Sequence, residues 1–531
     1  MKIRLSYVIT CAFSLLALIC SPSVFSADSY EKLDHRTPIL NDGSEANYQK
    51  FTLSIDQAKT LTAISFDTTG TTELEDVLEI GVKHLHQAGN REFGKTRQMG
   101  KNIKLAGKLA FPKGKHACQV LIRTKKGANL LHHVALQITA FHFADGSQLE
   151  VPLQANYQGQ YLAYPIHRQG EFDCHTFRIP GINQANNGDL LAVYDLRYNS
   201  RKDLQEDIDI GLSVSKDGGQ TWTDPRPIMD MGEYGGKSQK ENGCSDPGIL
   251  VDKATGEIFV AAVWTHGKPN THQWVAKGSE PGYGIHQSSQ FMVVRSKDHG
   301  LTWSEPENWT KKLKQESWHL FAPAPGNGIT LKDGTLVMPS QGRDAKGFPF
   351  SNITWSNDHG LTWQVSAPAT DDTSECAVAE LSDGSLMLNV RDNRNRKDKS
   401  DSNGRAVRVS RDLGKSWEKH SSDHGALPEP TCMASLISHA NNPGQLFFSN
   451  PRNKKSRMDM TIQMSLDDGK NWPEKYHILL DSGRGNGYSS LVIIDDKTIG
   501  ILYESSVADL VFQKILIKDF TDNDWQKLRI D

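Results

Sequence analysis

The chain has 531 residues, a formal net charge of −3 and 37% hydrophobic residues. This length exceeds that of one ordinary compact domain, so we expect two domains or one large repeat architecture with an addition. The nearly balanced charge argues against a nucleic-acid partner, and the glycine-rich, moderately apolar composition argues against a disordered chain or a membrane-embedded one.

The first 26 residues have the composition of a secretory signal peptide. Two basic residues precede an apolar stretch, residues 7–20, that is too short to cross a bilayer, and small residues around Ser26 offer a cleavage point. We therefore expect residues 1–26 to be removed and the protein to be periplasmic or extracellular. A lipoprotein anchor at Cys20 is the alternative, disfavoured by the bulky Ile19. No later segment is long and apolar enough to span a membrane.

Residues 27–158 predict a separate β-rich domain. Runs such as FTLSI, ALQITAFHF and GSQLEVPL have the composition of strands, and polar turns separate them. We expect a small β-sandwich-like unit. Two roles stay open for it, carbohydrate binding and a scaffold packed on the rest of the chain.

The cysteines and histidines predict neither a disulfide framework nor a metal site. Outside the signal segment the five cysteines are odd in number and widely scattered, and the chain has no CxxC pair and no HExxH motif. We expect the protein to need no metal and no cofactor.

An octamer of the form S-x-D-x-G-x-[TSN]-W recurs five times after residue 200. Asp and Gly are turn residues, and a strand-like run precedes each octamer, so each one predicts a turn that ends a short strand. Five copies at intervals of 81, 60, 54 and 55 residues indicate a structural repeat, not a catalytic motif. The octamers are Ser215–Trp222, Ser296–Trp303, Ser356–Trp363, Ser410–Trp417 and Ser465–Trp472.

The repeat predicts the fold of residues 159–531. Further strand-like runs, such as GEIFVAAVW and GSLMLNV, lie between the octamers, and helical periodicity is nearly absent. Short antiparallel strands in units of about 50 residues favour a β-propeller with roughly four strands in each blade. We therefore predict an all-β protein, a six-bladed β-propeller with one blade lacking the octamer, preceded by the β-sandwich-like domain.

The order of motifs from about residue 160 to the C-terminus resembles that of bacterial exo-α-sialidases (neuraminidases) with Asp-box (BNR) repeats. The resemblance rests on the five octamers and on HTFRIP, residues 175–180, which opens the repeat region. It implies hydrolysis of terminal sialic acid from glycoproteins, glycolipids and oligosaccharides. Because propellers carry many activities, the function has to be argued from the site.

Sialic acid carries a carboxylate at its anomeric carbon, and arginine binds such an anion with a planar pair of donors. The family uses three arginines, and the resemblance assigns them to Arg178, Arg391 and Arg457. Arg452 is an alternative for the third position. Three converging cations need a counterion, and Glu504 in GILYESS matches the acidic residue that holds the first arginine in the family.

The family nucleophile is a tyrosine, which Tyr488 in GYSSL matches. A carboxylate nucleophile beside the substrate carboxylate would meet a repulsion of about 4 kcal/mol at ~4 Å and an effective dielectric constant near 20. A neutral phenol avoids this but needs a base because its reference pKa is near 10. The resemblance assigns that base to Glu375, with Glu380 as the alternative. We expect the arginine cluster to favour the phenolate.

The acid/base residue is assigned to Asp203, which follows Arg197 by six residues as in the family. It would protonate the leaving oxygen and then activate water. Asp207 and Asp209 are nearby alternatives. The resemblance also places Arg197 and Asp246 against the sugar, around its C4 and N-acyl groups.

Three classes of function fit these motifs. A retaining exo-sialidase uses the whole set; a non-catalytic sialoglycan-binding propeller needs the arginines but not the nucleophile, base and acid; a trans-sialidase or anhydro-sialidase uses the same site with another acceptor. The expected partners are sialylated glycans. Two basic runs, residues 394–399 and 452–457, are expected to be solvated loops.

Overall fold

The computed structural model describes residues 28–33, 35–154, 157, 159–268, 274–275 and 277–521. The predicted signal peptide and Cys20 lie outside the described residues. No helix in these ranges combines the length and the apolar composition that a membrane span requires.

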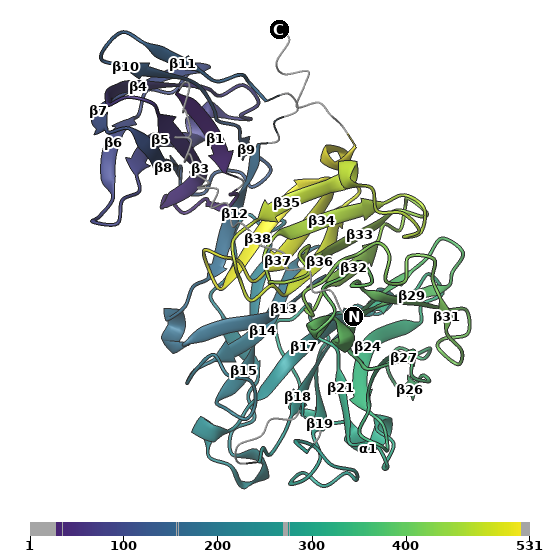
Figure 1. Ribbon diagram of the computed structural model, residues 1–531. Helices are drawn as coiled ribbons and strands as arrows, with labels where there is room; N and C mark the ends of the chain where they lie inside the picture. The colour runs from purple at the N-terminus through teal and green to yellow at the C-terminus, as the bar shows by residue number, and fades with distance from the viewer. Residues whose placement is uncertain are drawn as a thin grey trace, which may run out of the picture.

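Two antiparallel sheets form the N-terminal part of the molecule (Figure 1). Their facing sides share one buried apolar cluster that includes Phe51, Ile64 and Phe141. In strand order, the first contains β1 (Ser29–Leu33), β3 (Glu45–Ile55), β8 (Gly114–Thr124), β5 (Val77–His84) and β6 (Arg91–Thr96). The second contains β11 (Gln148–Glu150), β10 (Gln137–Phe143), β4 (Lys59–Asp67) and β7 (Asn102–Phe111). Strand β7 alternates buried and exposed residues because its other face meets solvent.

The N-terminal sheets are joined to the rest of the chain by pairing as well as by packing. Short strands β2 (Ile39–Leu40) and β9 (His133–Val134) both pair with β12 (Gln160–His167). The apolar cluster of the N-terminal sheets continues through Leu162 to Phe512 near the C-terminus. The junction is therefore a continuous core and not a bare linker.

Six further sheets follow in chain order, and we refer to them as blades 1 to 6. Blade 1 contains β13 (Thr176–Gln184), β14 (Leu190–Arg197), β15 (Ile208–Ser215) and β16 (Arg226–Met229). Blade 2 contains β17 (Cys244–Val251), β18 (Ile258–Trp264), β19 (Gln290–Ser296), β20 (Glu307–Asn308) and β22 (Gly326–Asn327). Blade 3 contains β21 (Leu320–Pro323), β23 (Ile329–Thr330), β24 (Leu336–Arg343), β25 (Pro349–Ser356), β26 (Gln364–Val365) and β27 (Thr370–Asp371).

The remaining blades have four main strands each. Blade 4 contains β28 (Thr373–Glu380), β29 (Leu386–Asp392), β30 (Ala406–Ser410) and β31 (Glu418–Lys419). Blade 5 contains β32 (Ser435–Ser438), β33 (Leu446–Pro451), β34 (Met460–Ser465) and β35 (His477–Asp481). Blade 6 contains β36 (Ser489–Asp495), β37 (Thr498–Tyr503), β38 (Leu510–Leu516) and β12.

Strands of successive blades contact one another in a closed circuit. Strand β13 contacts both β17 and β36, and contacts continue from β17 to β24, from β24 to β28, from β28 to β32 and from β32 to β36. Blade 6 is completed by β12, which comes before blade 1 in the chain and pairs with β38 near its end. A closed circuit of six sheets is the arrangement that a six-bladed propeller requires.

The prediction of an all-β fold is confirmed. The one α-helix in the described part is α1 (Thr310–Leu313), a single turn. Short 3-10 helices complete the connections: η1 (Leu74–Asp76), η2 (Glu171–Asp173), η3 (Tyr234–Gly236), η4 (Gln239–Glu241), η5 (Asn393–Arg396), η6 (Glu474–Tyr476) and η7 (Ile517–Phe520).

Each octamer begins at the last residue of the third main strand of its blade, which is β15, β19, β25, β30 or β34. In the third copy, Ser356 Oγ accepts a hydrogen bond from Gly360 N (2.9 Å) and donates one to Asp358 (2.7 Å). Asp358 Oδ1 also accepts from Thr362 N (2.9 Å), and Trp363 Nε1 donates to Gly360 O (3.1 Å). The turn requires a left-handed backbone at Gly360, where φ is 80°. In this copy the hydrogen bonds that hold the turn therefore lie within the octamer.

The first octamer also packs against blade 6. A Cβ atom at Gly219 would overlap the Phe512 ring of β38, and the rings of Trp222 and Phe512 lie 5.0 Å apart. This contact joins the beginning of the blade circuit to its end.

We expect Gly219→Ala to lower the free energy of unfolding by about 2–4 kcal/mol, because the new methyl group meets Phe512 and φ is 92° there. Gly384→Ala is the matched control: φ is 81°, but nothing lies within 4 Å of the added Cβ, so the expected loss is about 1 kcal/mol. Chemical denaturation measures both values, and equal losses would contradict the packing argument.

Candidate active site

One pocket of about 220 Å³ collects residues from all six blades. Most of these residues lie in the first or second strand of a blade or in a loop next to it. Seven of the nine residues predicted for the site line this pocket: Arg178, Asp203, Asp246, Glu375, Arg391, Arg457 and Tyr488. The other two, Arg197 and Glu504, lie behind its wall.

Three of these residues sit at irregularities of the first strands. The pairing register shifts between Arg178 and Gly181 in β13, between Ser245 and Gly248 in β17, and between Thr373 and Cys376 in β28. Such bulges bend a strand and turn a side chain out of the regular alternation. The shifts coincide with Arg178, Asp246 and Glu375, which explains how three central strands present polar groups to one pocket.

The three predicted arginines surround the phenol of Tyr488. The guanidinium carbons of Arg178 and Arg457 each lie 5.3 Å from the centre of the Tyr488 ring, on whose face they exert a cation–π attraction. Arg391 Nη1 donates a hydrogen bond to Tyr488 Oη (3.0 Å). Arginines from blades 1, 4 and 5 therefore meet around one side chain.

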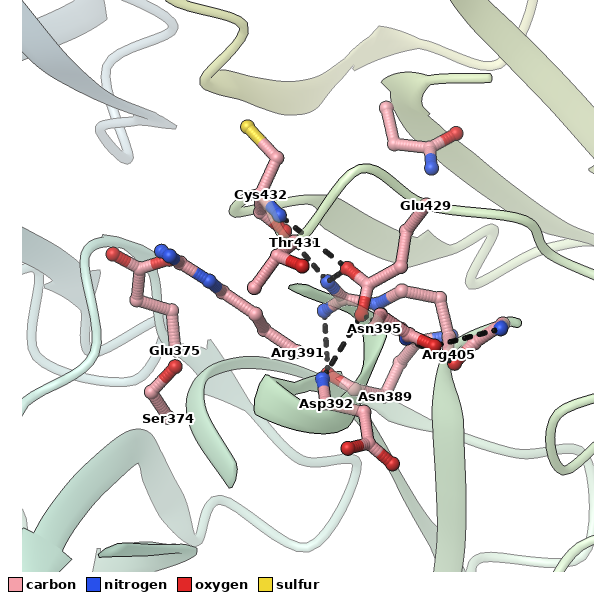
Figure 2. Close-up of polar contacts among 12 residues, drawn as sticks. Ser374, Glu375, Asn389, Arg391, Asp392, Asn395, Arg405, Glu429, Thr431 and Cys432 are labelled. Carbon is pink, nitrogen blue, oxygen red and sulfur yellow. Dashed lines mark hydrogen bonds and ion pairs between the residues drawn. The ribbon is translucent and has the colours of Figure 1, made fainter. Parts of the chain in front are cut away.

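Glu375 lies between the phenol and an arginine. Tyr488 Oη donates a hydrogen bond to Glu375 Oε1, and Arg391 Nη1 forms an ion pair with Glu375 Oε2. Figure 2 shows the carboxylate of Glu375 directed at the guanidinium group of Arg391. The base expected from the family pattern is thus in direct contact with the expected nucleophile.

Arg391 and Arg457 act on the Tyr488 phenol in the expected direction, toward the phenolate, but they do not decide its protonation. Burial and the charge of Glu375 raise the pKa of Tyr488 well above its ordinary value, and they outweigh the opposite effect of Arg391 and Arg457. The tyrosine is a neutral phenol at neutral pH and needs a base to lose its proton.

Glu504 does not line the pocket but binds two residues that do, Arg178 and Tyr488. Its carboxylate accepts hydrogen bonds from Arg178 Nε (2.9 Å), from Ile179 N (3.0 Å) and from Tyr488 N (2.9 Å). Burial opposes ionisation, but the charge and hydrogen bonds of Arg178 and the two backbone N–H groups lower the pKa of Glu504 below its ordinary value. One carboxylate therefore fixes an arginine and the backbone of the tyrosine together.

Arg197 was expected to contact the sugar, but the structure places it behind the pocket wall. Its side chain is fully buried. Its Nη1 donates a hydrogen bond to Asp203 Oδ1 (2.9 Å), and its Nη2 donates one to Asp195 Oδ2 (2.8 Å). Asp195 Oδ1 in turn accepts from Asp246 N (3.0 Å). Arg197 therefore holds the half-exposed Asp203 at the pocket.

Asp195 was not predicted as a site residue, although its spacing from Arg197 indicates that the two side chains lie together. Asp195 and Arg197 stand two residues apart in β14, so they share a face of the sheet. Burial is the main cause that raises the pKa of Asp195, and the Arg197 charge opposes it. Burial and the neighbouring carboxylates of Asp195, Asp203 and Glu375 raise the pKa of Asp246 well above its ordinary value.

The alternatives named from the sequence do not line this pocket. Arg452 forms an ion pair with Glu474 (2.9 Å) and lies in a cleft beside the N-terminal sheets. Glu380 accepts a hydrogen bond from a backbone amide and lines a second pocket. Asp207 and Asp209 are also absent from the pocket wall.

Two pocket arginines, Arg343 and Arg396, were not predicted for the site. Arg343 donates to the carbonyl groups of Trp274 and Gly347 (3.0 Å for Gly347). Arg396 is exposed at the end of η5 and belongs to the basic run 394–399. That run therefore contributes one residue to the pocket.

Among the described residues, no group of three or more His, Cys, Asp and Glu side chains could hold a metal ion. The five cysteines in these ranges are separate, buried thiols.

His424 is an ionisable group next to β29, the strand that carries Arg391. Its Nε2 lies 2.7 Å from Asp392 Oδ2, and its Nδ1 lies 3.1 Å from Asp423 Oδ2. Hydrogen bonds to Asp392 and Asp423 raise the pKa of His424 to about 9 from 6.5. His424 therefore binds a proton more tightly in the folded state than in the unfolded state.

We expect the stabilisation from His424 to be complete below pH 6.5 and to disappear as the pH rises to about 9. Denaturation at pH 6, 7.5 and 9 should show a decrease in the free energy of unfolding that is larger for the wild type than for His424→Asn. Parallel curves for the two proteins would contradict the prediction.

Comparison with known proteins gives a consistent family. The profile of the BNR repeat-like domain matches residues 188–502. A sialidase of Bacteroides fragilis (strain YCH46) is 36% identical over 543 residues, which covers 96% of this chain and 98% of that protein. Among solved structures, Hadza microbial sialidase Hz136 has a TM-score of 0.83 and 35% identity over 92% of this chain and 99% of that one. The intramolecular trans-sialidase from Ruminococcus gnavus, at 18% identity and a TM-score of 0.53, shares the fold.

Proposed function

The chain belongs to the sialidase family and is a glycoside hydrolase, and we propose that it is a retaining exo-α-sialidase that forms a covalent tyrosyl intermediate. The observation that carries the proposal is the contact of Tyr488 with both Glu375 and Arg391 inside a ring of three arginines. A protein that only binds sialosides does not need a base such as Glu375 hydrogen-bonded to a phenol.

The substrate carboxylate would lie among Arg178, Arg391 and Arg457. These three cations face two carboxylates, Glu375 and Glu504, so this side of the pocket retains one positive charge for one substrate anion. All three guanidinium groups are held by other protein groups before substrate arrives, which reduces the entropy lost on binding.

Bond formation begins at Tyr488. Its oxygen attacks the anomeric carbon, its proton passes to Glu375, and the glycosidic bond breaks as Asp203 protonates the leaving oxygen. Water then adds to the anomeric carbon and gives a proton to Asp203, the bond to Tyr488 breaks, and Glu375 returns the first proton. Two displacements at one carbon retain its configuration.

The surroundings of the acid agree with this role. Asp203 is held by the buried Arg197, whose charge is shared with Asp195, and its side chain is about half exposed, which gives it access to both the leaving group and water. Asp246, which is protonated more readily than an ordinary aspartate, would donate a hydrogen bond to a sugar oxygen.

The proposed substrates are sialylated glycoproteins, glycolipids and oligosaccharides. We further propose that residues 1–26 direct export to the periplasm or the medium, and that residues 27–158 form a domain of their own beside the catalytic residues 159–531. The continuous core at the junction supports a scaffolding role for this domain.

We expect Tyr488→Phe to lower kcat on a fluorogenic sialoside by at least about 100-fold, because the nucleophilic oxygen is lost. Tyr503→Phe is the control: this buried tyrosine of β37 donates to Gln513 and does not line the pocket. NMR of the wild-type reaction should show the α-anomer of free sialic acid first. Near-normal turnover by Tyr488→Phe, or the β-anomer first, would exclude the tyrosyl mechanism.

We expect Asp203→Asn to lower kcat/KM by about 1000-fold on sialyl-lactose, but by a much smaller factor on a sialoside of an acidic phenol. The phenol leaves without a proton, and kcat/KM reports the first displacement. Asp207→Asn, in the same loop but outside the pocket, should leave both values unchanged. Equal losses on the two substrates would remove the acid role from Asp203.

A further inference from the structure

We propose that the buried ion pair between Arg405 and Glu429 is a positioning element. It holds Arg391, Arg457 and Tyr488 in their positions relative to one another. The inference rests on the proposed function of these three residues. Neither member of the pair lines the pocket, and both side chains are fully buried. In Figure 2, Arg405 and Glu429 lie on the side of Arg391 opposite to Glu375.

Arg405 connects blade 4 to the loop before blade 5. Its Nε donates to Asn389 Oδ1 (2.7 Å) and its Nη2 to Asn389 O (3.3 Å), two residues before Arg391 in β29. Its Nη1 donates to Glu429 Oε2 (2.8 Å) and to Cys432 O (2.7 Å). The guanidinium group thus joins β29, which carries Arg391, to the segment that leads to β32.

Glu429 makes the complementary connection from the other side. Its Oε1 accepts hydrogen bonds from Asp392 N (2.9 Å) and Asn395 Nδ2 (2.7 Å). Asp392 is the residue after Arg391, so the pair holds β29 on both sides of the catalytic arginine. The backbone of Glu429 is bonded in both directions to the Asn403 amide.

The same segment reaches the other two site residues. Thr431 O accepts a hydrogen bond from Arg457 Nη2 (3.3 Å), and φ at Thr431 is 62°. Cys432 Sγ donates to Gly487 O (3.3 Å), the carbonyl group next to Tyr488, and Cys432 packs in one cluster with Tyr488. Moving residues 429–432 would therefore shift Arg457 and Tyr488 relative to Arg391.

Energetics favour a positioning role over a stabilising one. Replacing a buried ion pair with apolar residues of similar size is often neutral or stabilising, because the two charges no longer lose their hydration on folding. Here almost every polar atom of the pair is bonded to groups beside the site. A misplacement of about 1 Å can cost about 100-fold in rate.

The test is the double variant Arg405→Met/Glu429→Leu, which removes both charges together. We expect a folded protein whose kcat on a fluorogenic sialoside falls about 100-fold, while KM rises less than about tenfold, because Arg178 still binds the substrate carboxylate. Glu429→Gln keeps one acceptor oxygen and replaces the other with an NH2 group, so a donor then faces either Asp392 N or Arg405 Nη1. We expect a smaller loss of kcat than in the double variant, about tenfold.

The matched control is Arg295→Met/Glu257→Leu. This ion pair (2.8 Å) lies in blade 2, and neither member lines the pocket, so kcat should not change. The inference is overturned if the folded double variant or Glu429→Gln retains wild-type kcat, or if the control loses as much. If the double variant does not fold, Glu429→Gln decides alone. A wild-type protein without sialoside hydrolysis would instead refute the proposed function.

Discussion

The site depends on holding three guanidinium groups around one phenol. Like charges repel, and in a buried pocket this repulsion is much less screened than in water. The fold offsets it with carboxylates at fixed places: Glu504 bonds Arg178 and the backbone of Tyr488, and Glu375 lies between Arg391 and the phenol oxygen. These groups come from blades 1, 4 and 6, so the balance exists only when the circuit of blades is closed.

The circuit of blades brings these groups together through its central strands. Bulges in β13, β17 and β28 direct polar side chains into the pocket, while the regular parts of the same strands stay apolar and pack the blades. Buried polar pairs behind the wall then fix the orientations, with Arg197 and Asp195 on one side and Arg405 and Glu429 on the other. Substrate enters a site whose charges are already oriented, which is the condition for electrostatic catalysis.

Much of this architecture was predictable from local patterns. The octamers carry their own turn chemistry, so their positions predicted the ends of the third strands without any tertiary information. The family resemblance selected Glu375 over Glu380 and Arg457 over Arg452, and the structure brings the selected residues to one pocket and leaves the alternatives outside. The burial of Arg197 and the upward shift in the pKa of Tyr488 have no local sequence signal, because both depend on packing.

The sequence by itself determined the β-strand repeat, the turns between strands and the candidate residues of each blade, because those features depend on neighbours within a few positions. Only the tertiary structure decided which side chains meet. Arg405 and Glu429 have no marked local pattern, and their partners lie on other strands and loops. The spacing of Asp195 and Arg197 indicates their pairing, but the contact of Asp195 with Asp246 N joins two blades. The pKa of Tyr488 also follows from packing, since burial and a carboxylate 113 residues away outweigh two nearby cations.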